Sequence, residues 1–204
     1  MTTSRDLLLT VMDRPEGRGV DRGDLSLALA GAETVDLLAA RAVTLDGDRL
    51  AAVPGGEAGE ELLDQALALL ARESAGESVD DWLWRRGKGL PDVYLAALEA
   101  DGTLVREQVR RWGFLRDGRL VLADSAARRR AGHRWSADDP VFVALAAAVG
   151  LREEDTPPDL EPPGGPVGEV LDAVRHAVLE LTEERRLRTT RLDRANALYR
   201  SRGY

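Results

Sequence analysis

Residues 24–53 have the sequence DLSLALAGAETVDLLAARAVTLDGDRLAAV, and this stretch decides the fold. Leucine, alanine and valine recur at three- and four-residue steps through its first half, so they share one broad helical face. The polar side is narrow and consists of Ser26, Glu33, Asp36 and Arg41. A helix that is apolar nearly all round lies inside a protein, so we predict a buried central helix with Asp24 as its N-cap.

The end of the same stretch predicts a β-hairpin. Residues 43–45 alternate as a strand, Asp46-Gly47 supplies a turn with positive φ, and residues 50–53 return. Asp-Gly between two apolar runs is a strong local hairpin signal. We therefore expect a unit in which the central helix leads directly into a hairpin.

Apolar periodicity and capping residues predict further helices. They are expected at 60–72, from Ser78 with Asp81 as a capping box, from Pro91 until Asp101-Gly102 stops the helix, after Asp124 or Ser125, at 141–149 and at 170–199. The run at 6–12 is too short to be assigned, and the prolines and glycines of 152–168 predict a loop.

A second hairpin is expected to pair residues 112–115 with 120–122 across a turn at 116–119. The predicted fold is therefore mainly α, a helix-bundle core around a buried central helix, with two small β-hairpins. Residues 1–184 are expected to form a single domain. Residues 185–204 form an Arg-rich C-terminal segment, which either continues the last helix or frays.

The composition limits the class of protein. The chain has 204 residues, 44% of them hydrophobic, which is ordinary for a soluble globular domain. It has no cysteine, which excludes disulfides, thiolate metal ligands and a cysteine nucleophile. The first residues lack the pattern of a secretion signal, and no apolar run approaches about 18 residues. We therefore expect a cytoplasmic protein without a membrane span.

Charge is distributed unevenly along the chain. The net charge of -8 opposes unselective binding to nucleic acid. Residues 106–134 nevertheless hold nine arginines against three acidic residues, and residues 185–202 hold seven against one. Each of these segments carries a net charge of +6, so each is a candidate docking surface on an otherwise acidic protein.

The sequence contains no pattern typical of catalysis. The two histidines, His133 and His176, lie in a basic stretch and in the last expected helix. No zinc-protease, nucleophile-elbow, phosphate-loop or dinucleotide-binding motif is present. Adjacent acids such as Asp80 and Asp81 are typical of helix caps and solvated faces, and the usual metal ligands are missing. We therefore predict a non-enzymatic protein without a metal or cofactor.

The candidate site for an anion or lipid headgroup consists of Arg128, Arg130, His133 and Arg134. Arg130 is three residues from His133 and four from Arg134, so these three converge on one helical face. The fork of donors on arginine suits phosphate, and Trp112 or Trp135 could rest at a membrane interface. Each basic group near an anionic leaflet contributes about 1 kcal/mol, which predicts weak, reversible attachment. The alternative is a solvated arginine face that balances an acidic body.

Several short motifs occur in an order that resembles the Golgi phosphoprotein 3 (Vps-seventy-four type) family, including its bacterial members. These motifs are Leu7-Leu8-Leu9, residues 25–42 followed by VTLDGDRL at 43–50, LLDQAL at 62–67, Asp81-Trp82-Leu83, a helix and Asp-Gly-x-Leu at 95–104, and LADSAAR at 122–128. The motifs follow one another in order over roughly residues 5–150. On this resemblance the chain is identified as a bacterial member.

The resemblance implies a mainly α single domain and a non-enzymatic, peripheral-membrane adaptor at the inner face of the membrane. Eukaryotic members bind phosphatidylinositol 4-phosphate and retain Golgi glycosyltransferases. Their lipid pocket uses a tryptophan and an arginine around the central helix, which fall at Asp21 and Ala30 here. A later basic pair falls at Arg130 and His133. Half of the pocket is thus kept, but Asp21 would repel a phosphate, so the resemblance does not extend to headgroup selectivity.

Two other functions are consistent with the sequence. A helix followed by a hairpin is also the pattern of a winged-helix nucleic-acid binder, with residues 106–134 contacting phosphates. The apolar central helix and the acidic balance argue against it, so no nucleic-acid partner is expected. The other function is a protein-interaction adaptor whose Arg-rich C-terminal segment orders on a partner. The sequence identifies neither that protein partner nor the oligomeric state.

Overall fold

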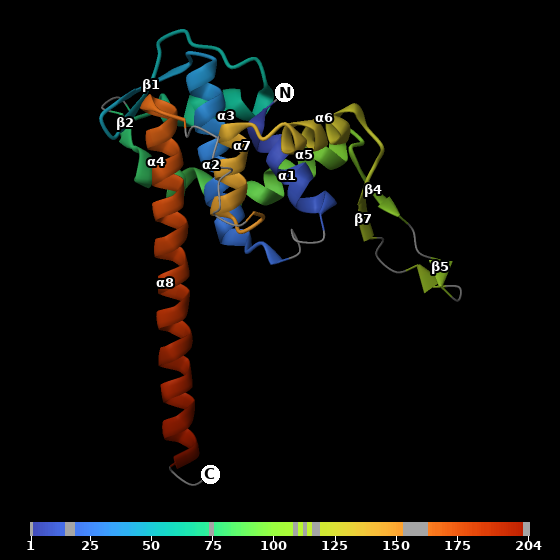
Figure 1. The fold of residues 1–204 in the computed structure, drawn as a ribbon, viewed down its shortest axis with the longest axis vertical. Helices are drawn as coiled ribbons and strands as arrows, with labels where there is room; N and C mark the ends of the chain where they lie inside the picture. The colour runs from blue at the N-terminus through green and yellow to red at the C-terminus, as the bar shows by residue number, and fades with distance from the viewer. Residues whose placement is uncertain are drawn as a thin grey trace.

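A computed structural model describes residues 2–14, 19–73, 76–107, 110–111, 114–115, 119–152 and 163–201. Over these residues the fold is mainly α with small hairpins, which confirms the predicted class. Helix α2 (Arg22–Ala39) lies at the centre, as Figure 1 shows. The helices that pack against it are α1 (Thr3–Asp13), α3 (Glu61–Leu70), α4 (Val79–Gly87), α5 (Leu90–Ala100), α7 (Pro140–Ala148) and α8 (Gly165–Ser201).

Helix α2 begins three residues earlier than the sequence suggested. The predicted N-cap, Asp24, was wrong, because the Asp21 side chain caps the helix by accepting a hydrogen bond from the backbone N–H of Gly23 at 2.7 Å. Asp24 instead lies in the first turn, where a carboxylate interacts favourably with the helix dipole. Two acids therefore stand at the start of α2.

The burial of α2 is more complete than its sequence indicated. Leu27 and Leu37, which fall outside the main apolar face, are both buried. Glu33 was expected on the polar side, but its exposed fraction is 0%. The expectation failed because α1, α4, α5 and α8 cover the helix from several directions and leave little of it to solvent.

The first predicted hairpin is confirmed. Strand β1 (Val43–Asp46) pairs antiparallel with β2 (Arg49–Ala52), and Gly47 takes a φ of 58° in the turn between them. A third strand, β3 (Glu77–Ser78), adds to the free edge of β2. This two-residue strand was not predicted, since so short a segment has no periodicity of its own.

The second hairpin has a different pairing from the predicted one. Strand β4 (Leu104–Glu107) pairs with β7 (Arg119–Leu122), and β5 (Arg110–Arg111) pairs with β6 (Phe114–Leu115) inside that outer pair. The predicted partner of residues 120–122 was therefore wrong. The pairing of β4 with β7 is favoured because it buries Leu104, which is 2% exposed, against the core. Trp112 and the turn residues 116–118 lie outside the described residues.

Side-chain caps fix the starts of most of the other helices. Ser78 caps α4 as predicted, since its hydroxyl accepts from the Asp81 N–H at 3.1 Å. The Asp81 carboxylate accepts from that hydroxyl at 2.7 Å, whereas in a capping box it accepts from the backbone N–H of the cap residue. Ser125, not Asp124, caps α6 (Ala126–Ser136), and Asp139 caps α7. The short apolar run at 6–12 belongs to α1, whose cap is Thr2.

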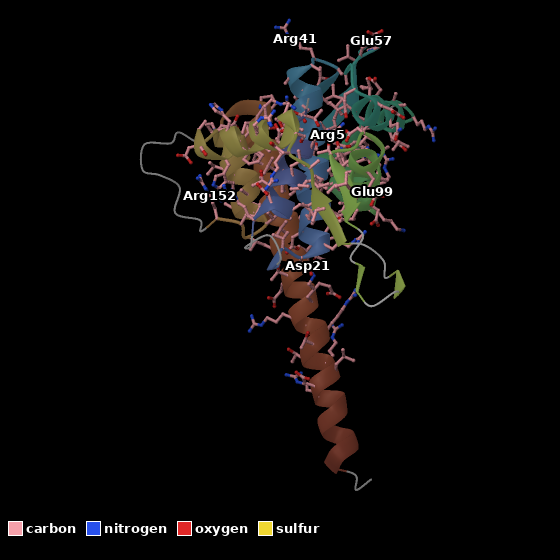
Figure 2. The ribbon with its side chains drawn as sticks, turned by 90° about the vertical axis from the view of Figure 1, so that its right-hand side faces the viewer. Arg5, Asp21, Arg41, Glu57, Glu99 and Arg152 are labelled. Atoms are coloured by element: carbon pink, nitrogen blue, oxygen red, sulfur yellow. The ribbon has the colours of Figure 1, made fainter. Side chains whose placement is uncertain are left out.

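Helix α8 is longer than predicted at its start and projects beyond the body at its end. It begins at Gly165 instead of Val170 and runs through the basic segment to Ser201. In Figure 1 its first half lies along the body, and its second half extends past the other helices. Arg185 ties it to the start of α2 through Asp21 and, at 2.8 Å, Asp24. Figure 2 shows Asp21 beside the point where α8 leaves the body.

Candidate functional site

Helix α6 carries all four residues of the predicted binding site. It packs on α1 and α7, and the alanines Ala127 and Ala131, one turn apart, are its buried residues. At about 100° per residue, the four basic residues spread round the helix to different distances from this buried stripe. Their environments therefore differ.

Arg134 points into the protein and is held there. Its guanidinium contacts the Asp6 carboxylate at 3.3 Å, that of Asp139 at 3.1 Å, and donates to the Thr3 hydroxyl at 3.2 Å. It also lies over the Phe142 ring, 5.2 Å from the centroid. Burial raises the pKa of Asp6, and Arg134 opposes that rise. Arg134 thus joins α6 to α1 and α7.

Arg128 lies on the other side of the buried stripe. It pairs with Asp13 at the end of α1 at 2.5 Å, with both side chains 39% exposed. Arg129 pairs with Asp124 at 2.7 Å. Two of the four predicted residues, Arg128 and Arg134, therefore already have carboxylate partners within the same chain.

Arg130 and His133 form the outward part of the predicted site. Both side chains are exposed, and their three-residue spacing places them next to each other on the solvent side of α6. Among the described residues neither one forms an ion pair. The structure thus brings this pair together and separates it from the paired Arg128 and Arg134.

Trp135 is engaged by arginines instead of standing free. The Arg14 guanidinium lies 4.1 Å from the Trp135 ring centroid and that of Arg152 lies 4.6 Å from it, distances typical of cation–π contacts. Arg152 also pairs with Asp138 at 2.6 Å. The ring is half-buried, so its contacts hold α6 against the ends of α1 and α7.

Asp21 and Ala30, which occupy the positions of the tryptophan and arginine in the family's lipid pocket, do not form an anion site. Ala30 is 0% exposed and lies in the core, where no surface ligand reaches it. Asp21 faces Arg185, so a carboxylate and its internal partner occupy the start of α2. Neither position therefore adds a positive charge beside Arg130 and His133.

A buried ionic cluster was missed by the sequence analysis. Arg86 donates from Nε to Glu33 Oε2 at 2.6 Å and from a terminal nitrogen to Oε1 at 2.8 Å. The Tyr94 hydroxyl donates to the same Oε1 at 2.9 Å. The one signal in the sequence was a carboxylate interrupting an otherwise apolar helix.

Burial controls the protonation of this cluster. It raises the pKa of Glu33, although Arg86 opposes the rise, and it raises the pKa of Tyr94, which remains a hydroxyl donor. Burial alone would lower the pKa of Arg86, but the paired Glu33 carboxylate holds it above its ordinary value. The cluster is closed and in the core, so it ties α2, α4 and α5 together.

Asp36 is a second acid whose pKa is raised by burial. The Thr3 backbone N–H and hydroxyl donate to its two oxygens at 2.7 and 2.6 Å. Burial nevertheless raises the pKa of Asp36 to about 6. The carboxylate caps the link between α1 and α2 and ionises near neutral pH.

The free energy of unfolding is expected to fall as the pH rises through about 6. Because the pKa of Asp36 is raised above its ordinary 3.8, the folded state holds this proton more tightly than the unfolded state. The resulting stabilisation is fully present below 3.8 and is lost as the pH passes the folded value. Urea denaturation over a pH series should show a shallower fall for Asp36→Asn than for wild type. Equal slopes would contradict the assignment.

His176 is the other histidine of the chain, and it lies far along the sequence from α6. His176 is exposed on α8 and lines a hollow with Asp48, Asp80, Glu169 and Asp172. Within the described ranges, no cluster of three or more histidines and acids is placed to hold a metal ion. No helix in the described part of the chain is both long and apolar enough to cross a bilayer.

The fold and α6 together define a mainly α protein with a small basic surface on an acidic body. The model of the Golgi phosphoprotein 3 (GPP34) family matches residues 4–163. This match covers well over half of the chain, so the protein belongs to that family, as the ordered motifs suggested. A comparison with curated proteins gives no match. Helix α8 lies beyond the matched residues.

Proposed function

We propose that this protein is a non-catalytic adaptor of the Golgi phosphoprotein 3 family that attaches reversibly to an anionic membrane surface through α6. Arg130 and His133 make the contacts, while Arg128 and Arg134 hold α6 on α1. The observation that supports this division is the exposed Arg130 and His133 pair beside two arginines that carboxylates already neutralise.

The attachment is driven by charge and does not select a headgroup. Ala30 is buried and Asp21 is paired with Arg185, so the central helix offers no donor to a phosphoinositide. Each basic side chain near an anionic leaflet contributes about 1 kcal/mol, which gives weak binding that salt reverses. Vesicles with phosphatidylserine and vesicles with phosphatidylinositol 4-phosphate at equal surface charge should therefore recruit the protein equally.

Charge reversal at Arg130 tests this proposal. Arg130→Glu is expected to weaken binding to vesicles of phosphatidylcholine and phosphatidylserine by roughly 30-fold, since it removes one favourable charge and adds an unfavourable one. Co-sedimentation at low salt measures the effect. Arg72→Glu is the control, because it makes the same change in net charge at an exposed position next to α3. Equal losses in both variants would contradict a site on α6.

A further inference from the structure

The second half of α8 has an exposed face on which arginine and leucine are neighbours. Every described side chain from Arg186 to Arg194 is exposed, and Figure 1 shows this part of the helix extending alone from the body. Leu187 and Leu192 are 43% and 65% exposed, so apolar area lies beside the arginines on this part of the helix. This segment lies outside residues 4–163, the part of the chain that the family model matches.

Four residues form this face, which we name the Arg/Leu patch: Leu187, Arg188, Arg191 and Leu192. The pairs 187/191, 188/191 and 188/192 are three or four residues apart, so these side chains are neighbours on one side of the helix. The opposite side carries Thr189, Thr190 and Asp193. Both threonine hydroxyls donate back to backbone carbonyls of α8, so neither O–H is free to donate outward. Arg186 also lies on that side.

The positive charge of the patch is largely uncompensated. Arg188 pairs with Glu184 at 2.9 Å, but both side chains are well exposed, and such a pair contributes little. Arg191 forms no ion pair with any described residue. Residues 185–202 carry a net charge of +6 and the other residues a net charge of -14, so the end of α8 is basic while the rest of the protein is acidic.

We propose that the Arg/Leu patch is a second attachment element that lies on an anionic lipid surface. The proposal rests on the proposed function, because it extends the same membrane attachment to a second helix. Arginines beside leucines match an anionic interface, where the charges meet headgroups and the apolar side chains enter the acyl boundary. Phosphates of a nucleic acid would leave the leucines in water, and a second copy of the patch would bring arginines against arginines.

Two weak elements on one body give firmer attachment than either alone. Arg185 fixes α8 to the start of α2, so the patch keeps a fixed place on the body that carries α6, and binding through α6 brings both to the membrane together. The second contact then forms at a high effective concentration. Loss of either element should weaken attachment to anionic vesicles.

The test uses the full chain and vesicles of phosphatidylcholine with phosphatidylserine. The double variant Arg188→Gln/Arg191→Gln lowers the net charge by two, as does Arg186→Glu on the threonine side. The double variant is expected to bind roughly 30-fold more weakly, and Arg186→Glu clearly less so. Leu187→Ser/Leu192→Ser is expected to bind roughly tenfold more weakly with an unchanged salt dependence, because it removes only apolar contact.

Different outcomes separate the two proposals. If Arg130→Glu weakens binding while the double arginine variant equals Arg186→Glu, the patch is overturned and the α6 site stands. If the reverse holds, the α6 site fails and the patch stands. The patch is also overturned if the leucine variant converts a dimer into a monomer in sedimentation velocity, or if duplex DNA binds the wild type and loses affinity for the arginine variant while vesicles do not.

Discussion

Replacing Arg86 with methionine is expected to lower the free energy of unfolding by about 3–5 kcal/mol. Glu33 is 0% exposed, and its carboxylate depends on the two donors of Arg86 and the hydroxyl of Tyr94. Methionine fills a similar length but leaves a buried charge without a counterion. Urea denaturation of the full chain, followed by circular dichroism, measures the loss.

Arg85→Met is the matched control for Arg86→Met. Arg85 is the preceding residue, but its side chain is 39% exposed where it pairs with Glu77, and its guanidinium lies over the Trp82 ring at 5.2 Å. Its removal should cost about 1 kcal/mol or less. The loss in Arg86→Met should also shrink at low pH, where Glu33 takes up a proton, and Glu33→Gln should recover part of it. Equal losses at Arg85 and Arg86 would show that Glu33 does not need its counterion.

The core of α2 could be predicted because periodic leucine and alanine report directly on burial. The role of Glu33 could not be, since its partner Arg86 is 53 residues away and periodicity treats any carboxylate as polar. The same pattern that identified the helix thus assigned Glu33 to the wrong side. An acid in a helix that is apolar nearly all round is a reason to look for a distant arginine.

The environments of the four basic residues on α6 could be predicted only in part, for a related reason. Helical spacing shows which residues are neighbours, so Arg130 and His133 were placed together. It does not show which face a neighbouring helix covers, and the partners of Arg128 and Arg134 on α1 lie 115 and 128 residues away. Ala127 and Ala131 are the signal that was available, because two small residues one turn apart mark the covered side of an otherwise charged helix.

The end of α8 stays helical although its residues are mostly polar. Rising polarity beyond Arg185 suggested fraying, but arginine and leucine are good helix formers. The pairs Glu183 with Arg186 and Glu184 with Arg188 also stabilise consecutive turns. A helix can therefore continue into solvent without a core to pack against, and its exposed faces are then free to bind.

Replacing Gly31 with valine is expected to lower the free energy of unfolding by about 3 kcal/mol. Gly31 on α2 lies close against α8: a Cβ there would lie 2.2 Å from Cγ2 of Val174. Val174 is β-branched and has one strongly preferred helical rotamer, so it cannot turn aside. Helix α8 would have to move away from the core, exposing Val170 and Ala177, which are buried in the wild type.

Gly132→Val provides the control, because a Cβ at Gly132 on α6 meets nothing within 4 Å. That variant should change the stability by less than about 0.5 kcal/mol, since valine and glycine differ little in an exposed helix once contacts are absent. Val174→Ala in the Gly31→Val background should recover stability, so that the double variant loses less than the sum of the two single losses. Hydrogen exchange should show lost protection in the first half of α8 for Gly31→Val. If Gly31→Val matched Gly132→Val, the contact with α8 would not hold in solution, and the projecting half of α8 would not be fixed to the body that carries α6.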